Sequence, residues 1–103
     1  MRHNIKKPRV LKTNWVKELS VSVIFNNGES RIIDFALLFK ELGIDIDSPA
    51  FILNSPEEFQ KVELQNNTLS WPNVEQYIHS KNNDKIRVPY EIGSDILLKF
   101  SHT

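Results

Sequence analysis

Residues 19–35 constrain this chain most, because they read as two β-strands joined by a tight turn. Apolar residues alternate with mostly polar ones over residues 19–25, the period of two of a half-buried strand. Asn27 and Gly28 follow, and both accept the positive φ that tight hairpin turns require. The return segment, residues 29–35, is rich in β-branched residues. The pattern predicts a β-hairpin with one apolar face.

Two registers are open for this hairpin. A two-residue loop pairs Val23 with Ile32, whereas a three-residue loop with a left-handed Gly28 pairs Val21 with Ile33. A slip of one residue moves every side chain of a strand to the other face. We expect the three-residue loop, because it gathers a set of apolar side chains on one face. That set is Leu19, Val21, Val23, Phe25, Ile33 and Phe35.

Length and composition indicate one domain. The chain has 103 residues, 40% hydrophobic and 25% charged, which is ordinary for a globular domain. We expect residues 1–7 to form a disordered basic arm and residues 8–103 to form a single α+β domain. The absence of cysteine excludes disulfides and thiolate zinc sites. No apolar run reaches the ~18 residues of a membrane helix, so we expect a cytoplasmic protein without a membrane partner.

The net charge of zero conceals an asymmetry. Residues 1–17 carry six basic residues and no acidic one, whereas the remainder carries seven basic and thirteen acidic residues. A basic arm on an acidic body either contacts nucleic acid or remains a solvated tail, and we prefer the solvated tail. The nucleic-acid alternative would use Arg2, Lys6, Lys7, Arg9 and Lys12.

Flanking segments have their own signals. Residues 8–11 predict a short strand, and Thr13 and Asn14 predict a turn. Beyond the hairpin, apolar residues at i, i+3, i+4 and i+7 predict a helix over residues 35–42. Asp34 is its expected N-cap, and Gly43 is its expected left-handed closing residue.

Two short helical segments are expected next. Ser48 and Pro49 predict a single turn that seats Phe51 and Ile52. Residues 55–58, Ser-Pro-Glu-Glu, predict a capping box in which serine and glutamate satisfy each other's backbone N–H groups. This box would begin a short helix anchored by Phe59.

A second hairpin is predicted over residues 61–71. Asn66 and Asn67 would form its turn, and Val62, Leu64, Leu69 and Trp71 would point inward. Pro72 lacks the N–H that a ladder needs and would end this hairpin.

The remainder of the chain is more ambiguous. Residues 73–78 predict a short helix and residues 81–85 a polar loop. Over residues 86–100, a helix opened by Pro89, a shorter helix capped by Ser94 and a strand over residues 96–100 all remain open. We expect a short helix there. The fold class is thus α+β: a small two-layer domain with an antiparallel sheet of two hairpins and short helices packed on one face.

No motif proposes catalysis. His3, His79 and His102 are far apart in the sequence, and Asp45 and Asp47 lack the remaining positions of a calcium loop. The serines lie outside a nucleophile-elbow motif, and the glycines are too isolated to cradle a phosphate. We therefore expect a non-enzymatic protein with no catalytic residue, no metal site and no cofactor.

Protein binding is the better expectation. Two hairpins leave free sheet edges, and free edges accept strands from other chains. Homodimerisation or capture of a protein partner through such an edge is the leading prediction. Trp71 and Asn73 are the candidate partner-binding residues, because tryptophan is enriched at binding hot spots. Trp71 is more simply explained as a core residue.

The order of motifs carries a resemblance. Pro8-Arg9-Val10 comes first, and the strand at residues 19–23 and the Asn27-Gly28 turn follow. Ile33-Asp34-Phe35 and residues 68–73, Thr-Leu-Ser-Trp-Pro-Asn, complete the series. Over about residues 8–73 the chain resembles the small bacterial family known as domain of unknown function 2442. It departs from that family at Val74, where members often have glycine, and in its longer tail.

The resemblance implies a small α+β fold with an antiparallel sheet and no established activity. Some members are joined to a helix-turn-helix domain or encoded beside a toxin-like partner, which implies an antitoxin-like or regulatory role. We predict an interaction or regulatory module that binds a protein partner or itself. The alternative is a nucleic-acid-binding protein that uses the basic N-terminal arm.

Overall fold

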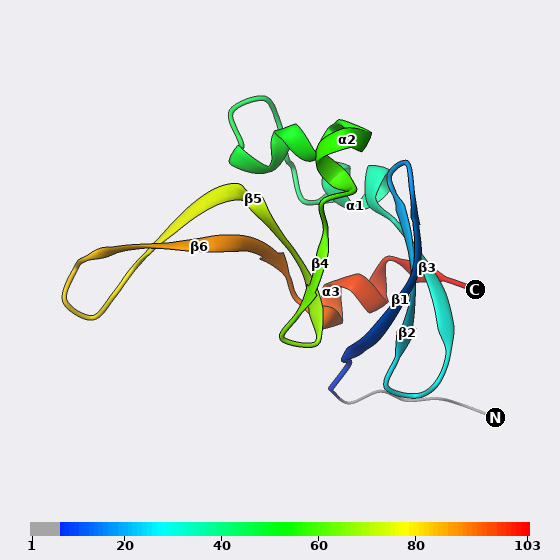
Figure 1. Cartoon of the computed structure of the whole chain (residues 1–103). Coiled ribbons are helices and arrows are strands. Elements are labelled where there is room, and N and C mark those ends of the chain that lie inside the picture. Colours follow the sequence, from blue (N-terminus) through cyan, green and yellow to red (C-terminus); the bar gives the residue numbers. More distant parts are fainter. Residues whose placement is uncertain (1–6) are drawn as a thin grey trace.

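Two antiparallel sheets and several short helices enclose one core in the computed structural model, which describes residues 7–103 (Figure 1). The four-stranded sheet has the order β1-β2-β3-β7, and the three-stranded sheet has the order β4-β5-β6. The predicted α+β class with short helices is confirmed. The two predicted hairpins belong to separate sheets.

The elements follow in chain order. The first sheet contains β1 (Val10–Lys17), β2 (Ser20–Phe25), β3 (Ser30–Asp34) and β7 (Ser101–His102). The second contains β4 (Glu63–Gln65), β5 (Thr68–His79) and β6 (Lys85–Ile92). The helices are α1 (Phe35–Glu41), the 3-10 helix η1 (Pro49–Asn54), α2 (Pro56–Phe59) and α3 (Ser94–Lys99).

The β2–β3 hairpin has the expected three-residue register. Val21 pairs with Ile33, the Phe25 N–H donates to the Glu29 carbonyl at 3.0 Å, and Gly28 is left-handed with φ +86°. Five of the six apolar side chains of this face are fully buried, and Leu19 packs against them. Burial of this face therefore selects the register.

The predicted turn at Thr13 and Asn14 is wrong. β1 continues through both residues and pairs with β2, with a register shift between Thr13 and Trp15. An irregularity of this kind breaks the alternation of side chains without ending a strand. The chain turns instead just after β1, where Glu18 takes φ 53°.

Helix α1 begins and ends close to the expected residues. The Asp34 carboxylate accepts from the Leu37 N–H at 3.2 Å, which confirms the cap, and Gly43 closes the helix with φ +69°. In η1 the expected burial is wrong, because Ala50 and Leu53 are buried whereas Phe51 and Ile52 are largely exposed. A 3-10 helix repeats every three residues, which places residues 50 and 53 on one face.

Helix α2 lacks the predicted capping box. The Ser55 side chain makes no capping hydrogen bond, although the Ser55 carbonyl accepts from the Phe59 N–H at 2.9 Å. The Glu58 side chain is engaged by Lys61 and Asn73 instead. Phe59 is the buried anchor of this helix, as expected.

The β4–β5 hairpin has the predicted turn, with Asn66 and Asn67 both left-handed. Its predicted end at Pro72 is wrong. β5 runs on to His79, and the predicted helix over residues 73–78 is a strand. The ladder between β5 and β6 is interrupted between Trp71 and Glu75, so proline lies where the ladder is irregular.

Of the alternatives left open over residues 86–100, only the shorter helix is confirmed; the helix opened by Pro89 and the strand over residues 96–100 are wrong. Pro89 lies inside strand β6, and the expected short helix is α3. Gly93 is the N-cap of α3, while the Ser94 hydroxyl donates to the Asn67 carbonyl at 2.6 Å. That bond joins α3 to the β4–β5 turn.

The core contains an aromatic cluster that joins α1 and α2 to the three-stranded sheet. Neighbouring rings lie 5.0–6.2 Å apart, all in tilted or edge-to-face contact, which is favourable for aromatic pairs. The members are Phe35, Phe39, Phe59, Trp71 and Tyr90. A backbone bond from the Val10 N–H to the Asn67 carbonyl, at 2.7 Å, links the two sheets.

Candidate interaction surface on the β5–β6 ribbon

Trp71, a predicted partner-binding residue, lies at the centre of the core. Its side chain is completely buried, and the indole N–H donates to the Phe59 carbonyl at 2.9 Å. Tyr90, directly opposite on β6, lies 6.1 Å away between ring centroids. Trp71 therefore anchors α2 to the root of the β5–β6 hairpin.

Asn73, the second predicted partner-binding residue, is half-buried beside α2. Its amide nitrogen donates to both the carbonyl and the carboxylate of Glu58, each at 3.1 Å. The Asn73 amide, together with Lys61, holds the pKa of Glu58 below its ordinary value. The Asn73 side-chain oxygen is buried and accepts no hydrogen bond from the described residues.

A cavity of about 270 Å³ lies between this root and residues 44–50, which lead into η1 and form its first turn. Its lining is mainly apolar and consists of Ile44, Ser48, Pro49, Ala50, Gln76 and Tyr90. Burial raises the pKa of the Tyr90 hydroxyl. The side-chain oxygen of Gln76 is buried without a hydrogen-bond donor among the described residues.

Beyond Gln76 the hairpin projects from the body as a two-stranded ribbon (Figure 1). We call residues 76–88 the ribbon. Its pairs are Gln76 with Val88, Tyr77 with Arg87, Ile78 with Ile86 and His79 with Lys85. The described Cα atoms have a radius of gyration of 14.2 Å, compared with about 13 Å for a compact domain of this length.

The ribbon is amphipathic. Directly paired residues share a face and successive residues alternate, so Gln76, Ile78, Ile86 and Val88 form one face. This apolar face continues the side of β6 that carries Tyr90 in the core. Ile78 is nevertheless 46% exposed and Ile86 45% exposed. The ribbon therefore extends an apolar face of the domain into solvent.

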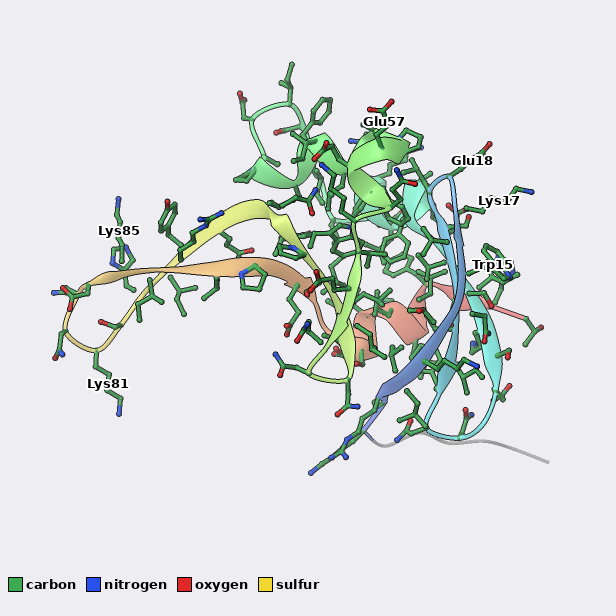
Figure 2. All side chains as sticks on the ribbon, in the orientation of Figure 1. Trp15, Lys17, Glu18, Glu57, Lys81 and Lys85 are labelled. Atoms are coloured by element: carbon green, nitrogen blue, oxygen red, sulfur yellow. The ribbon has the colours of Figure 1, made fainter. Side chains whose placement is uncertain are left out.

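The other face of the ribbon is aromatic and basic. It carries Tyr77, His79, Lys85 and Arg87, and all four are exposed. Lys81 and Lys85 project from the far end of the ribbon in different directions (Figure 2).

Among residues 7–103, no further strand pairs with either edge of the ribbon. β6 is the outer strand of its sheet, and β4 pairs with β5 only as far as Ser70. Within the described chain, the backbone groups of residues 76–79 on the β4 side therefore have no ladder partner. Such an edge is a template for an added strand.

The basic residues predicted for nucleic-acid binding are only partly described. Lys7, Arg9 and Lys12 are exposed, and the Lys7 carbonyl accepts from the Asn26 amide at 3.0 Å. Arg2 and Lys6 lie outside the described residues, as does most of the arm predicted over residues 1–7.

No three His, Asp or Glu side chains within residues 7–103 are grouped so that they could hold a metal ion. None of the helices in that range is long and apolar enough to cross a membrane.

Comparisons of the chain with family models, with curated proteins and with solved structures give no match. The resemblance to the domain of unknown function 2442 family therefore remains a prediction from the motifs.

The sequence reasoning missed the ribbon, although a signal for it exists. Ile86, Val88, Tyr90 and Ile92 alternate with polar residues or proline, which is the period of a half-buried strand. The helical interpretation of residues 73–78 removed the strand with which this segment pairs. Sequence reasoning therefore named Trp71 and Asn73 at the root and passed over the exposed residues beyond them.

Proposed function

We propose that this chain is a non-enzymatic interaction module that binds a protein through the β5–β6 ribbon. One observation carries the proposal: Ile78 and Ile86 share a ribbon face that continues the core face and is left in solvent. Isolated two-stranded hairpins are marginally stable in water at best. Covering the apolar face and free edges of the ribbon would bury apolar area and supply backbone partners.

The resemblance to the domain of unknown function 2442 family adds a regulatory or antitoxin-like role to this proposal. Such a role requires tight binding of a protein, and the apolar face and free edges of the ribbon are suited to that. Trp71 and Asn73 then serve by fixing the root of the ribbon, through the bonds from Trp71 to Phe59 and from Asn73 to Glu58.

Affinity capture from the native cell tests the proposal. The tagged chain is compared with the Ile78→Asp/Ile86→Asp variant, and captured proteins are identified by mass spectrometry. A matched control, Leu11→Asp/Leu37→Asp, places the same change at exposed side chains elsewhere. We expect the ribbon variant to lose a protein, or a second copy of the chain, that the control retains. Equal recovery by both variants would contradict the proposal.

Nucleic-acid binding is the second candidate, and the exposed basic face of the ribbon favours it alongside Arg9 and Lys12. Such binding would weaken steeply with salt, because it releases counterions. Because Val10 is fully buried, deletion of residues 1–12 would damage the core. The test instead replaces Arg2, Lys6, Lys7, Arg9 and Lys12 by glutamine and measures the salt slope of duplex DNA and RNA binding. An unchanged slope would contradict a role of the N-terminal arm.

A further inference from the structure

We infer that the ribbon's occupant is a second copy of this chain, and that each copy packs its ribbon on residues 41–63 of the other. We call residues 41–63 the helical lobe, because they contain η1 and α2 and the segments around them. This inference rests on the proposed function and names its partner.

Charge is the first reason for a second copy. The ribbon carries three basic residues, Lys81, Lys85 and Arg87, and one acidic residue, Asp84. The helical lobe carries one basic residue, Lys61, and a set of acidic ones. That set is Glu41, Asp45, Asp47, Glu57, Glu58 and Glu63. The ribbon thus has a net positive charge and the helical lobe a net negative charge, which is the complementarity that steers two copies together.

Apolar exposure is the second reason. The lobe leaves Ile46 78%, Phe51 39% and Ile52 43% exposed, and Ile46 stands between Asp45 and Asp47 in the sequence. Protein interfaces have an apolar centre that is enriched in aromatic side chains, and a polar rim surrounds this centre. The ribbon therefore has exposed isoleucines on one face and basic side chains on the other face and at its tip, and the lobe has exposed apolar side chains and a net negative charge.

A single chain does not bring these two surfaces together. The lobe meets β5 at the ribbon root, where the cavity of about 270 Å³ separates residues 44–50 from Gln76 and Tyr90. Past Gln76 the ribbon runs away from the lobe (Figure 1). A second copy related by a two-fold axis can satisfy both, since the ribbon–lobe contact then occurs twice.

Charge reversal in the full chain tests this arrangement by sedimentation velocity. The ribbon charge variant is Lys81→Glu/Lys85→Glu, and the lobe variant is Asp47→Lys/Glu57→Lys. All four side chains are exposed. Each variant alone faces like charges at both contacts, so we expect its dimer dissociation constant to rise by at least about tenfold. In an equimolar mixture both contacts are again between opposite charges, and the dimer should return.

The control variant Lys12→Glu/Lys17→Glu makes the same charge change at exposed positions of β1 and should dimerise like the unmodified chain. A chain that stays monomeric at every concentration would overturn the inference. So would a lobe variant that dimerises normally, or a mixture that stays monomeric.

The two proposals fail separately. If the chain is monomeric and its Ile78→Asp/Ile86→Asp variant loses a captured protein, the inference of a second copy is contradicted and the proposed interaction module is retained. If the chain is monomeric and that variant captures the same proteins as the unmodified chain, both the proposed function and the inference of a second copy are contradicted.

Discussion

Trp71 connects three parts of the molecule: α2, the aromatic core and the root of the ribbon. Its indole N–H donates to the buried Phe59 carbonyl at 2.9 Å. Trp71→Phe should lower the free energy of unfolding by about 2–4 kcal/mol, because it opens a void and removes the indole bond to that carbonyl, which keeps only the Val62 N–H at 3.2 Å. Urea unfolding followed by circular dichroism measures the loss.

The matched control is the second tryptophan, Trp15, which is 43% exposed. Trp15→Phe should cost less than about 1 kcal/mol, as is usual for surface positions. Similar losses at the two positions would contradict the anchoring role of Trp71.

Glu58 makes the free energy of unfolding depend on pH. Its pKa is held below the ordinary value of 4.5, first by the Asn73 amide and then by Lys61. As pH falls, the unfolded chain binds the proton first, so this contribution to stability is present above pH 4.5 and disappears as pH falls through the lower pKa of the folded state. Asn73→Ala should raise the pKa of Glu58 and shrink that acid-induced loss.

NMR titration of Glu58 and urea unfolding between pH 7 and pH 3 test this expectation. Glu57→Gln, at the exposed neighbour on the same helix, is the control and should leave the pKa of Glu58 nearly unchanged. An Asn73→Ala variant with an unaltered Glu58 titration would show that the amide does not set this pKa.

At the scale of elements, the β2–β3 hairpin depends on its turn. Gly28 has φ +86°, and a Cβ built there meets no atom within 4 Å, so the cost of a side chain is conformational alone. Gly28→Ala should therefore cost about 1–2 kcal/mol of unfolding free energy. Gly28→Asn should cost clearly less, because asparagine visits the left-handed region more readily. Thermal unfolding that ranks alanine equal to glycine would contradict this explanation.

Local signals predicted the elements whose determinants lie close together in sequence. The β2–β3 register follows from one apolar face and one turn, and α1 follows from its stripe and its Asp34 cap. Determinants that lie far apart in sequence were missed. β1 keeps pairing through its irregularity because β2 lies beside it, and β5 continues past Pro72 because β6 returns along it. Pairing between strands, rather than local propensity, decides both segments.

In the candidate site, too, the local signals were recognised and the pairing of distant segments was missed. Trp71 and Asn73 were singled out by residue type, and the structure gives them anchoring bonds at the ribbon root. The ribbon itself depends on pairing between residues 76–79 and 85–88, which a helical interpretation of one partner hides. Its amphipathic character appears only when the two strands are aligned.

At the scale of the whole molecule, the body and the ribbon have different roles. The core contains residues from both sheets, α1, η1, α2 and α3, but none of the residues 76–88. The ribbon therefore contributes little to the core that stabilises the fold, and its own isoleucines, Ile78 and Ile86, are left exposed. This separation is what an element devoted to association requires.

Replacement of residues 77–87 by Asn-Gly tests this separation directly. The substitution keeps the Gln76–Val88 pair and closes it with a turn that suits a hairpin. Under monomeric conditions the shortened chain should unfold with a free energy within about 1 kcal/mol of the full chain. In sedimentation velocity it should remain monomeric at concentrations where the full chain dimerises. A shortened chain that fails to fold, or that associates as the full chain does, would contradict the assignment of association to the ribbon.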